Sequence, residues 1–169
     1  MIDFAHRINA WIKISTPAVI SLVLIIFSAT NFQLPGLDSF VPLFAFMTIF
    51  YWAIYNPSLM PAWFVFVLGI FQDFIYGTPF GVASFVNLLL WWLAVSQRKY
   101  LIKERFIVFW LVFSVISLLF CLITSVLFSI YYQKFVLSND IIMQWLFSAF
   151  IYPFLHKLFN VIHVVYLKN

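Results

Sequence analysis

The chain has 169 residues, of which 66% are hydrophobic, 22% aromatic and only 8% charged. Nine Lys and Arg with five Asp and Glu cannot coat a folded surface of this size, and a mean hydropathy of +1.09 leaves no segment polar enough for disorder. The composition excludes a soluble globule and indicates an integral membrane protein. The net charge of +4 is spread thinly between apolar runs, which suits orientation in a bilayer and not binding to nucleic acid.

Six mostly apolar runs are long enough to be candidate spanning helices, each bounded by charge, Pro, Gly or Asn. They cover residues 17–32, 40–55, 59–76, 80–96, 106–132 and 141–156. We expect one all-α transmembrane domain over residues 1–169, with an interfacial amphipathic segment at 1–15 and a helical bundle at 16–165. The second run is short and carries Pro42 near its start, so we expect it to be tilted or only partly buried in lipid.

The distribution of Lys and Arg between the connecting segments predicts the orientation of the chain. With the N-terminus in the cytoplasm, eight of the nine basic residues lie inside and only Lys134 lies outside. The inside set is Arg7, Lys13, Arg98, Lys99, Lys103, Arg105, Lys157 and Lys168. Both termini are therefore expected in the cytoplasm, with short external turns at 33–39, 77–79 and 133–140.

Aromatic and histidine residues gather near two predicted membrane interfaces. Tyr51 and Trp52 favour an aromatic belt, with a protein-facing groove as the alternative. Near the C-terminus, His156, Asn160 and His163 share one helical face. Because no Cys or carboxylate completes a metal site there, we interpret this face as the wetted side of an interfacial helix.

One ionisable residue, Asp73, clearly lies inside a predicted span, where charge is costly and therefore informative. Gly69 and Gly77 share its helical face, so a neighbouring helix can approach the carboxylate closely. Gly77, Pro79 and Gly81 predict a sharp turn into the next helix, whose first N–H groups point back toward Asp73. We expect Asp73 to orient helices, ahead of ligand binding, proton transport or contact with a partner's backbone.

Polar residues on the later predicted helices lie at a similar depth and form a possible polar layer around Asp73. They are Ser84, Asn87, Thr124, Ser125, Gln144 and Ser148. We expect Asp73 to hydrogen-bond to Asn87, to Gln144 or to the first amides of the fourth helix, or else to stay protonated.

The residues required for catalysis are missing from the chain. A single intramembrane carboxylate cannot supply the acid and base pair of an aspartyl protease. The sequence has no H-E-x-x-H, no G-x-S-x-G and no P-loop. We therefore expect no enzyme, no catalytic residue, no cofactor and no metal.

Seven residues follow a characteristic order: a Trp and a Pro, then Gly-x-x-x-Asp, then a Gly, Pro, Gly turn that opens the next helix. They are Trp52, Pro57, Gly69, Asp73, Gly77, Pro79 and Gly81. Their order and spacing resemble the rod-shape-determining membrane proteins of the MreD family. The resemblance covers roughly residues 42–91, and the rest of the chain agrees with the family only in hydropathy and length.

The resemblance implies a non-catalytic scaffold or regulatory subunit of the cell-wall elongation complex in the bacterial inner membrane. The implied partners are an MreC-like single-span protein, a class B penicillin-binding transpeptidase, a shape-determining glycosyltransferase, an MreB-type cytoskeleton and membrane lipid. The seven motif residues are then candidates for partner binding or for a structural hub, with Asn87 and Gln144 as possible hub partners. We expect the MreC-like helix to dock on the face of the second to fourth helices, through Gly69.

The alternative function also follows from the resemblance, because structures of the family look like the six-helix substrate-binding subunits of energy-coupling-factor transporters. It is a substrate-binding subunit for a small, vitamin-type solute. Such a subunit needs an enclosed external pocket with convergent polar groups, for which Asp73, Asn87 and Gln144 are the strong candidates. An independent transporter is less favoured, because we find no internal repeat.

Overall fold

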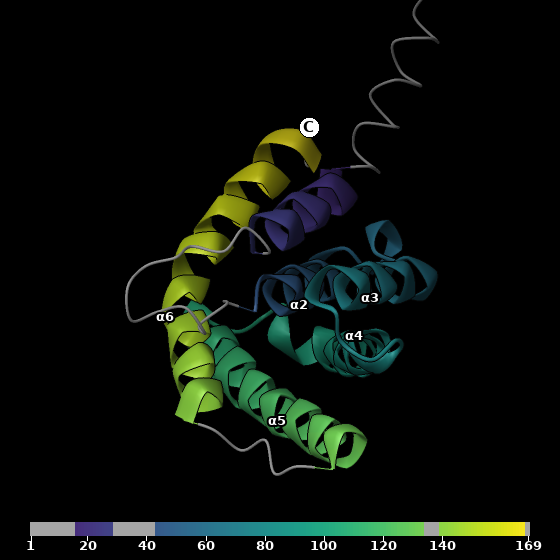
Figure 1. Ribbon diagram of the computed structural model, residues 1–169. Coiled ribbons are helices and arrows are strands. Elements are labelled where there is room, and N and C mark those ends of the chain that lie inside the picture. Colours follow the sequence, from purple (N-terminus) through teal and green to yellow (C-terminus); the bar gives the residue numbers. More distant parts are fainter. Residues whose placement is uncertain (1–15, 29–42, 134–138, 168–169) are drawn as a thin grey trace, which may run out of the picture.

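The computed structural model describes residues 16–28, 43–133 and 139–167. Within them the chain forms six α-helices: Thr16–Ser28, α2 (Phe44–Tyr55), α3 (Ala62–Tyr76), α4 (Val82–Leu101), α5 (Phe106–Tyr132) and α6 (Asn139–Ile162). A 3₁₀ turn at Pro57–Leu59 joins α2 to α3, and a π-helical turn at His163–Leu167 follows α6. Figure 1 shows α3 and α4 side by side, with α6 running along the opposite side of the bundle. The all-α prediction is confirmed.

Two helices, Phe106–Tyr132 and Ile141–Val165, are long and apolar enough to cross a membrane, and three further apolar helices are shorter. The bounds of α5 are those predicted, whereas α4 continues to Leu101 and α6 continues past residue 156. The last turn of α4 carries Arg98 and Lys99, and cations stabilise a helix C-terminus. The segment 1–15, predicted to be interfacial, and residues 29–42, which include Pro42, lie outside the described residues.

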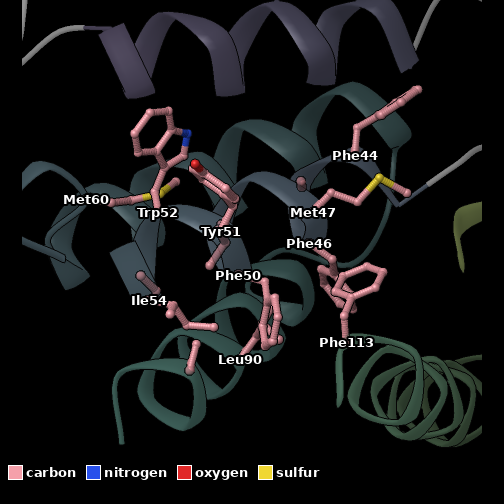
Figure 2. Packing of buried hydrophobic residues seen from close by; sticks show 14 of the residues in the cluster. Phe44, Phe46, Met47, Phe50, Tyr51, Trp52, Ile54, Met60, Leu90 and Phe113 are labelled. Carbon is pink, nitrogen blue, oxygen red and sulfur yellow. The ribbon is translucent and has the colours of Figure 1, made fainter. Parts of the chain in front are cut away.

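The short helix α2 is the centre of the bundle. Every residue from Phe44 to Ile54 is buried, as expected for a helix that is apolar on all sides. Figure 2 shows Phe50 on the side of α2 that faces Phe113 of α5, with Tyr51 and Trp52 on the side toward helix Thr16–Ser28. The described part of this run is buried in protein, so its predicted partial burial in lipid is wrong, and so is the aromatic belt at Tyr51 and Trp52. Protein surrounds this helix, so its length need not match the bilayer.

His156 is partly buried among aromatic rings. Its ring centroid is 5.2 Å from that of Tyr51, 4.9 Å from that of Phe106 and 5.0 Å from that of Phe109. The wetted face predicted here is wrong for His156, because α6 continues past it and aromatic rings from α2 and α5 cover it. Asn160, one turn further along, is exposed as expected.

Two tryptophans link α5 to α6 through backbone carbonyls. Pro153 lies inside α6 and has no N–H, so the carbonyl of Ala149 loses its usual donor. Trp110 of α5 supplies one, its Nε1 lying 2.8 Å from that oxygen. In the other direction, Nε1 of Trp145 in α6 donates to the Ser114 carbonyl of α5 at 2.7 Å. The indole of Trp110 thus replaces the hydrogen bond that the proline removes.

We predict that Trp110→Phe destabilises the bundle only while Pro153 is present. The phenyl ring keeps the packing but leaves the Ala149 carbonyl unpaired, a loss of about 1–3 kcal/mol in the free energy of unfolding. In a Pro153→Ala background the restored N–H pairs with that carbonyl, so the same substitution is expected to cost less than half as much. Thermal unfolding of the four purified variants in detergent measures this coupling. Equal losses in both backgrounds would contradict it.

Candidate functional site

Asp73 lies in the last turn of α3, with 1% of its surface exposed. Its Oδ2 accepts a hydrogen bond from the Gly81 amide at 2.8 Å, and its Oδ1 accepts one from the Ala83 amide at 3.0 Å. The Thr78 hydroxyl donates to Oδ1 at 2.7 Å. Both carboxylate oxygens therefore act as acceptors at the N-terminus of α4, where amide dipoles stabilise negative charge. Of the partners predicted from the sequence, Asp73 binds the first amides of α4, and the Thr78 hydroxyl is a further partner that was not predicted.

Glycines form the turn that brings α4 back to Asp73. Gly77 ends α3 with φ of 62°, and Gly81 precedes α4 with φ of 95°, both in the left-handed region that glycine adopts without strain. Between them lies Pro79, whose carbonyl accepts a hydrogen bond from the Val82 amide at 3.3 Å. The two glycines therefore reverse the chain within a few residues, so that the first amides of α4 face the carboxylate.

Gly69 lies one turn before Asp73, at the closest approach of α3 to α4. A Cβ built on Gly69 would overlap the Ser84 Cα and lie 2.6 Å from the Ser84 nitrogen. The Ser84 hydroxyl donates to the Phe66 carbonyl of α3 at 3.1 Å. The close helix contact expected at Gly69 is thus made with α4 of the same chain. The expectation that Gly69 lies on a docking face is wrong, because α4 covers it.

The remaining two motif residues belong to the opposite end of the bundle. Trp52 is fully buried near the end of α2, and Pro57 is the first residue of the 3₁₀ turn that follows. At this end the Arg98 Nε donates to the Ile54 carbonyl at 2.7 Å, and Nε1 of Trp91 donates to the Met60 carbonyl at 2.8 Å. The motif therefore divides into a cluster around Asp73 and a pair that lies at the far end of α2.

A cavity of about 320 Å³ opens beside Asp73, between the first turns of α2, α4 and α6 and the last turns of α3 and α5. Beside Asp73, its polar lining includes four residues of the layer predicted from the sequence: Asn87, Thr124, Ser125 and Gln144. It also includes Gln72 and Thr78. Its apolar lining includes Phe44, Phe46, Val86, Phe128 and Ile141. Two of the predicted polar residues, Ser84 and Ser148, are not among the lining residues; Ser148 donates to its own helix at Gln144.

Asn87 lies fully buried in the wall of this cavity. Its Nδ2 donates to Gln72 Oε1 at 3.0 Å, whereas its Oδ1 has no hydrogen-bond partner among the described residues. Buried amide oxygens are nearly always paired, so an unpaired one is an informative exception. Asn87 was expected at this site from the sequence, whereas Gln72 and Thr78 were not. Their positions could have indicated them, because Gln72 directly precedes Asp73 and Thr78 lies in the turn between Gly77 and Gly81.

The chemistry available at this site is binding and positioning. Among the described residues that line the cavity, Asp73 is the only charged one, and intrachain donors hydrogen-bond to both of its oxygens. Within the described part of the chain, no three His, Cys, Asp or Glu side chains converge as a metal site would require. The cavity therefore offers neutral hydrogen-bonding groups against an apolar wall.

Residues 7–162 match the family described as rod shape-determining protein MreD. The chain belongs to this family. The matched range contains all six described α-helices, so the likeness covers the Asp73 cluster and the later helices alike. No curated protein and no solved structure matches the chain. As an MreD-family member it is a multi-span membrane protein with a role in rod-shape determination, and the family is non-catalytic.

We predict graded losses of stability at Asp73 in this MreD-family chain. Asp73→Leu leaves the Gly81 and Ala83 amides unpaired, and each buried unpaired donor costs about 1–3 kcal/mol in the free energy of unfolding. Asp73→Asn keeps one acceptor oxygen, so it is expected to cost about half as much. Thermal unfolding in detergent measures both, with Glu104→Leu in the exposed α4–α5 connection as control. Equal losses for the two Asp73 variants would refute the hydrogen-bonding role.

We also predict that Gly69→Ala lowers the melting temperature by several degrees, because the added methyl group forces α3 and α4 apart. Ser84→Gly in the same protein does not restore stability, since the overlap involves the Ser84 backbone. Val67→Ala, on the exposed face of α3, serves as the control and is expected to have little effect. A Gly69→Ala protein that melts with the wild type would show that the helices are not in close contact.

Proposed function

We propose that this MreD-family chain is a non-catalytic scaffold of the cell-wall elongation complex in the bacterial inner membrane. In this proposal six helices span the membrane and both termini lie in the cytoplasm, as the distribution of basic residues predicts. The observation that carries the proposal is the family match over residues 7–162. The geometry supports it, because the one buried carboxylate among the described residues hydrogen-bonds to the start of α4 through both of its oxygens and so holds two helices together.

We propose that the MreC-like single-span partner docks on the outer face of α3. Its exposed side chains follow one helical stripe: Trp63, Phe66, Val67, Ile70 and Phe74. Trp63 is 68% exposed and Phe74 is 74% exposed. The docking surface expected from the sequence included α2, but α2 is buried and offers no exposed face. The proposed surface is therefore limited to α3 and the adjoining side of α4.

The length of α3 supports a protein neighbour on this face. A helix of 15 residues rises about 22 Å, whereas the hydrocarbon core is about 30 Å thick. A helix shorter than the bilayer is accommodated by thinning of the lipid or by association with other helices. A partner helix along the stripe would cover these side chains and reduce the mismatch between the length of α3 and the thickness of the bilayer. The 27-residue α5 is long enough to have no such mismatch.

The other partners belong to the proposal by family resemblance alone. The transpeptidase and the glycosyltransferase share the membrane with this chain, and an MreB-type cytoskeleton would meet its cytoplasmic side. On that side the α4–α5 connection exposes Lys103, Glu104 and Arg105, which suits either anionic lipid or an acidic partner surface.

The second candidate function, a substrate-binding subunit for a small solute, is favoured by one observation. The cavity beside Asp73 has the convergent polar groups and apolar wall that such a subunit needs. A transporter subunit would also have to dock an energising module on its cytoplasmic face. Capture of an ATP-hydrolysing module by crosslinking at Lys103, and no capture of cell-wall enzymes, would favour this function over the scaffold.

We predict that a photoreactive amino acid at Phe66 or Ile70 of α3 crosslinks the single-span partner in living cells. The matched control positions are Leu119 and Val126, which are similarly exposed on α5. Mass spectrometry identifies the captured proteins. Crosslinks of equal yield from the α5 positions, or only lipid adducts from α3, would contradict the proposed docking face.

We predict that cells carrying Asp73→Asn keep rod shape better than cells carrying Asp73→Leu. The amide retains part of the contact with α4, whereas the alkyl side chain retains none. Cell width is measured by microscopy at matched levels of membrane-inserted protein. If both variants produce equally round cells, the charge itself is required, and the scaffold role of Asp73 fails.

A further inference from the structure

The cavity beside Asp73 contains a hydrogen-bond acceptor that the described chain does not use. Asn87 is fully buried, and its Oδ1 is without a partner on the cavity wall. Its Nδ2 donates to Gln72 Oε1 at 3.0 Å, which leaves Oδ1 as the group without a partner among the described residues. An unpaired buried amide oxygen costs free energy that an N–H or O–H donor would recover.

The charges around the cavity restrict what can bind. The described lining has no Lys, Arg or His, so an anion such as a phosphate would be desolvated without a counter-charge. Among the described lining residues a cation would find only Asp73, and that carboxylate already accepts hydrogen bonds from Thr78, Gly81 and Ala83. A neutral molecule avoids both costs.

The size and wall of the cavity restrict the ligand further. Its volume of about 320 Å³ lies at the lower end of the usual range for small-molecule sites, roughly 300–1,000 Å³. Phe44, Phe46 and Phe128 contribute aromatic surface to the wall. Such a space fits a compact apolar body with one polar end, and not the long acyl chain of a membrane lipid.

We propose that this cavity binds a neutral small molecule whose apolar body packs against the phenylalanines and whose N–H or O–H donates to Asn87 Oδ1. Carboxamides are the chemical class of best fit, because a carboxamide presents both a donor for Asn87 Oδ1 and an acceptor for the side-chain amide N–H groups of Gln72, whose Oε1 pairs with Asn87. This inference goes beyond the scaffold function and does not depend on it.

Three aromatic probes of the same shape test the proposal on the purified full chain. They are 2-naphthamide, which is neutral and has a donor, methyl 2-naphthoate, which is neutral without one, and 2-naphthoate, which is an anion. Thermal unfolding at increasing probe concentration measures binding, and native mass spectrometry detects bound molecules. We expect a saturable rise in melting temperature with the amide and at least a tenfold weaker effect with the other two.

Two variants locate the effect. Asn87→Leu removes the acceptor at similar volume, and Ala83→Leu narrows the cavity while leaving its backbone amide to Asp73. Both are expected to weaken binding of 2-naphthamide at least tenfold, whereas Ser96→Leu, on the exposed surface of α4, leaves it unchanged. Because melting temperature is compared with and without probe, a lower intrinsic stability does not obscure the result.

The proposal fails under three results. The first is no saturable effect of 2-naphthamide together with no small molecule retained in native mass spectra. The second is binding that Asn87→Leu and Ala83→Leu leave unchanged. The third is loss of the amide effect when the chain is purified with its membrane partners, which would show that a partner polypeptide occupies the cavity. Persistence of the effect in that complex supports the small-molecule site.

Discussion

The contact between the Asp73 carboxylate and the first amides of α4 is the constraint on which the bundle depends. Burying a carboxylate is costly, and here the amides of Gly81 and Ala83 and the Thr78 hydroxyl offset that cost at a helix N-terminus. The same contact fixes α4 antiparallel to α3. Gly69 then allows the backbones to approach until Ser84 meets α3 directly.

Because α4 is held against α3, its other side is free to pack against α2. This leaves α2 enclosed by protein, with Phe50 against α5 and Phe44 against Phe27 of helix Thr16–Ser28. The long helices α5 and α6 form the opposite wall, linked by the two indole-to-carbonyl hydrogen bonds. Short helices therefore lie inside or beside a wall of membrane-length helices, and the bilayer does not have to match each helix separately.

The two ends of the bundle differ in structure. At the Asp73 end, the contact between α3 and α4 forms one wall of a cavity that also touches α2, α5 and α6. At the other end, Arg98 holds the C-terminus of α2, and the exposed basic residues after it suit the cytoplasmic surface. In the proposed scaffold function, the basic end faces the cytoplasm and the cavity lies at the external end.

The class of protein, the bounds of α5, the turn at Gly77 to Gly81 and the contact of Asp73 with the first amides of α4 could all be predicted from the sequence. These follow from local properties: apolar length, glycine conformation and the cost of a charge in lipid. The enclosure of α2, the partial burial of His156 and the pairing of Gln72 with Asn87 were decided only by the tertiary structure. When every face of a helix is apolar, its pattern does not distinguish lipid from protein as a neighbour, so only packing reveals which faces are covered and which polar atoms are left without a partner.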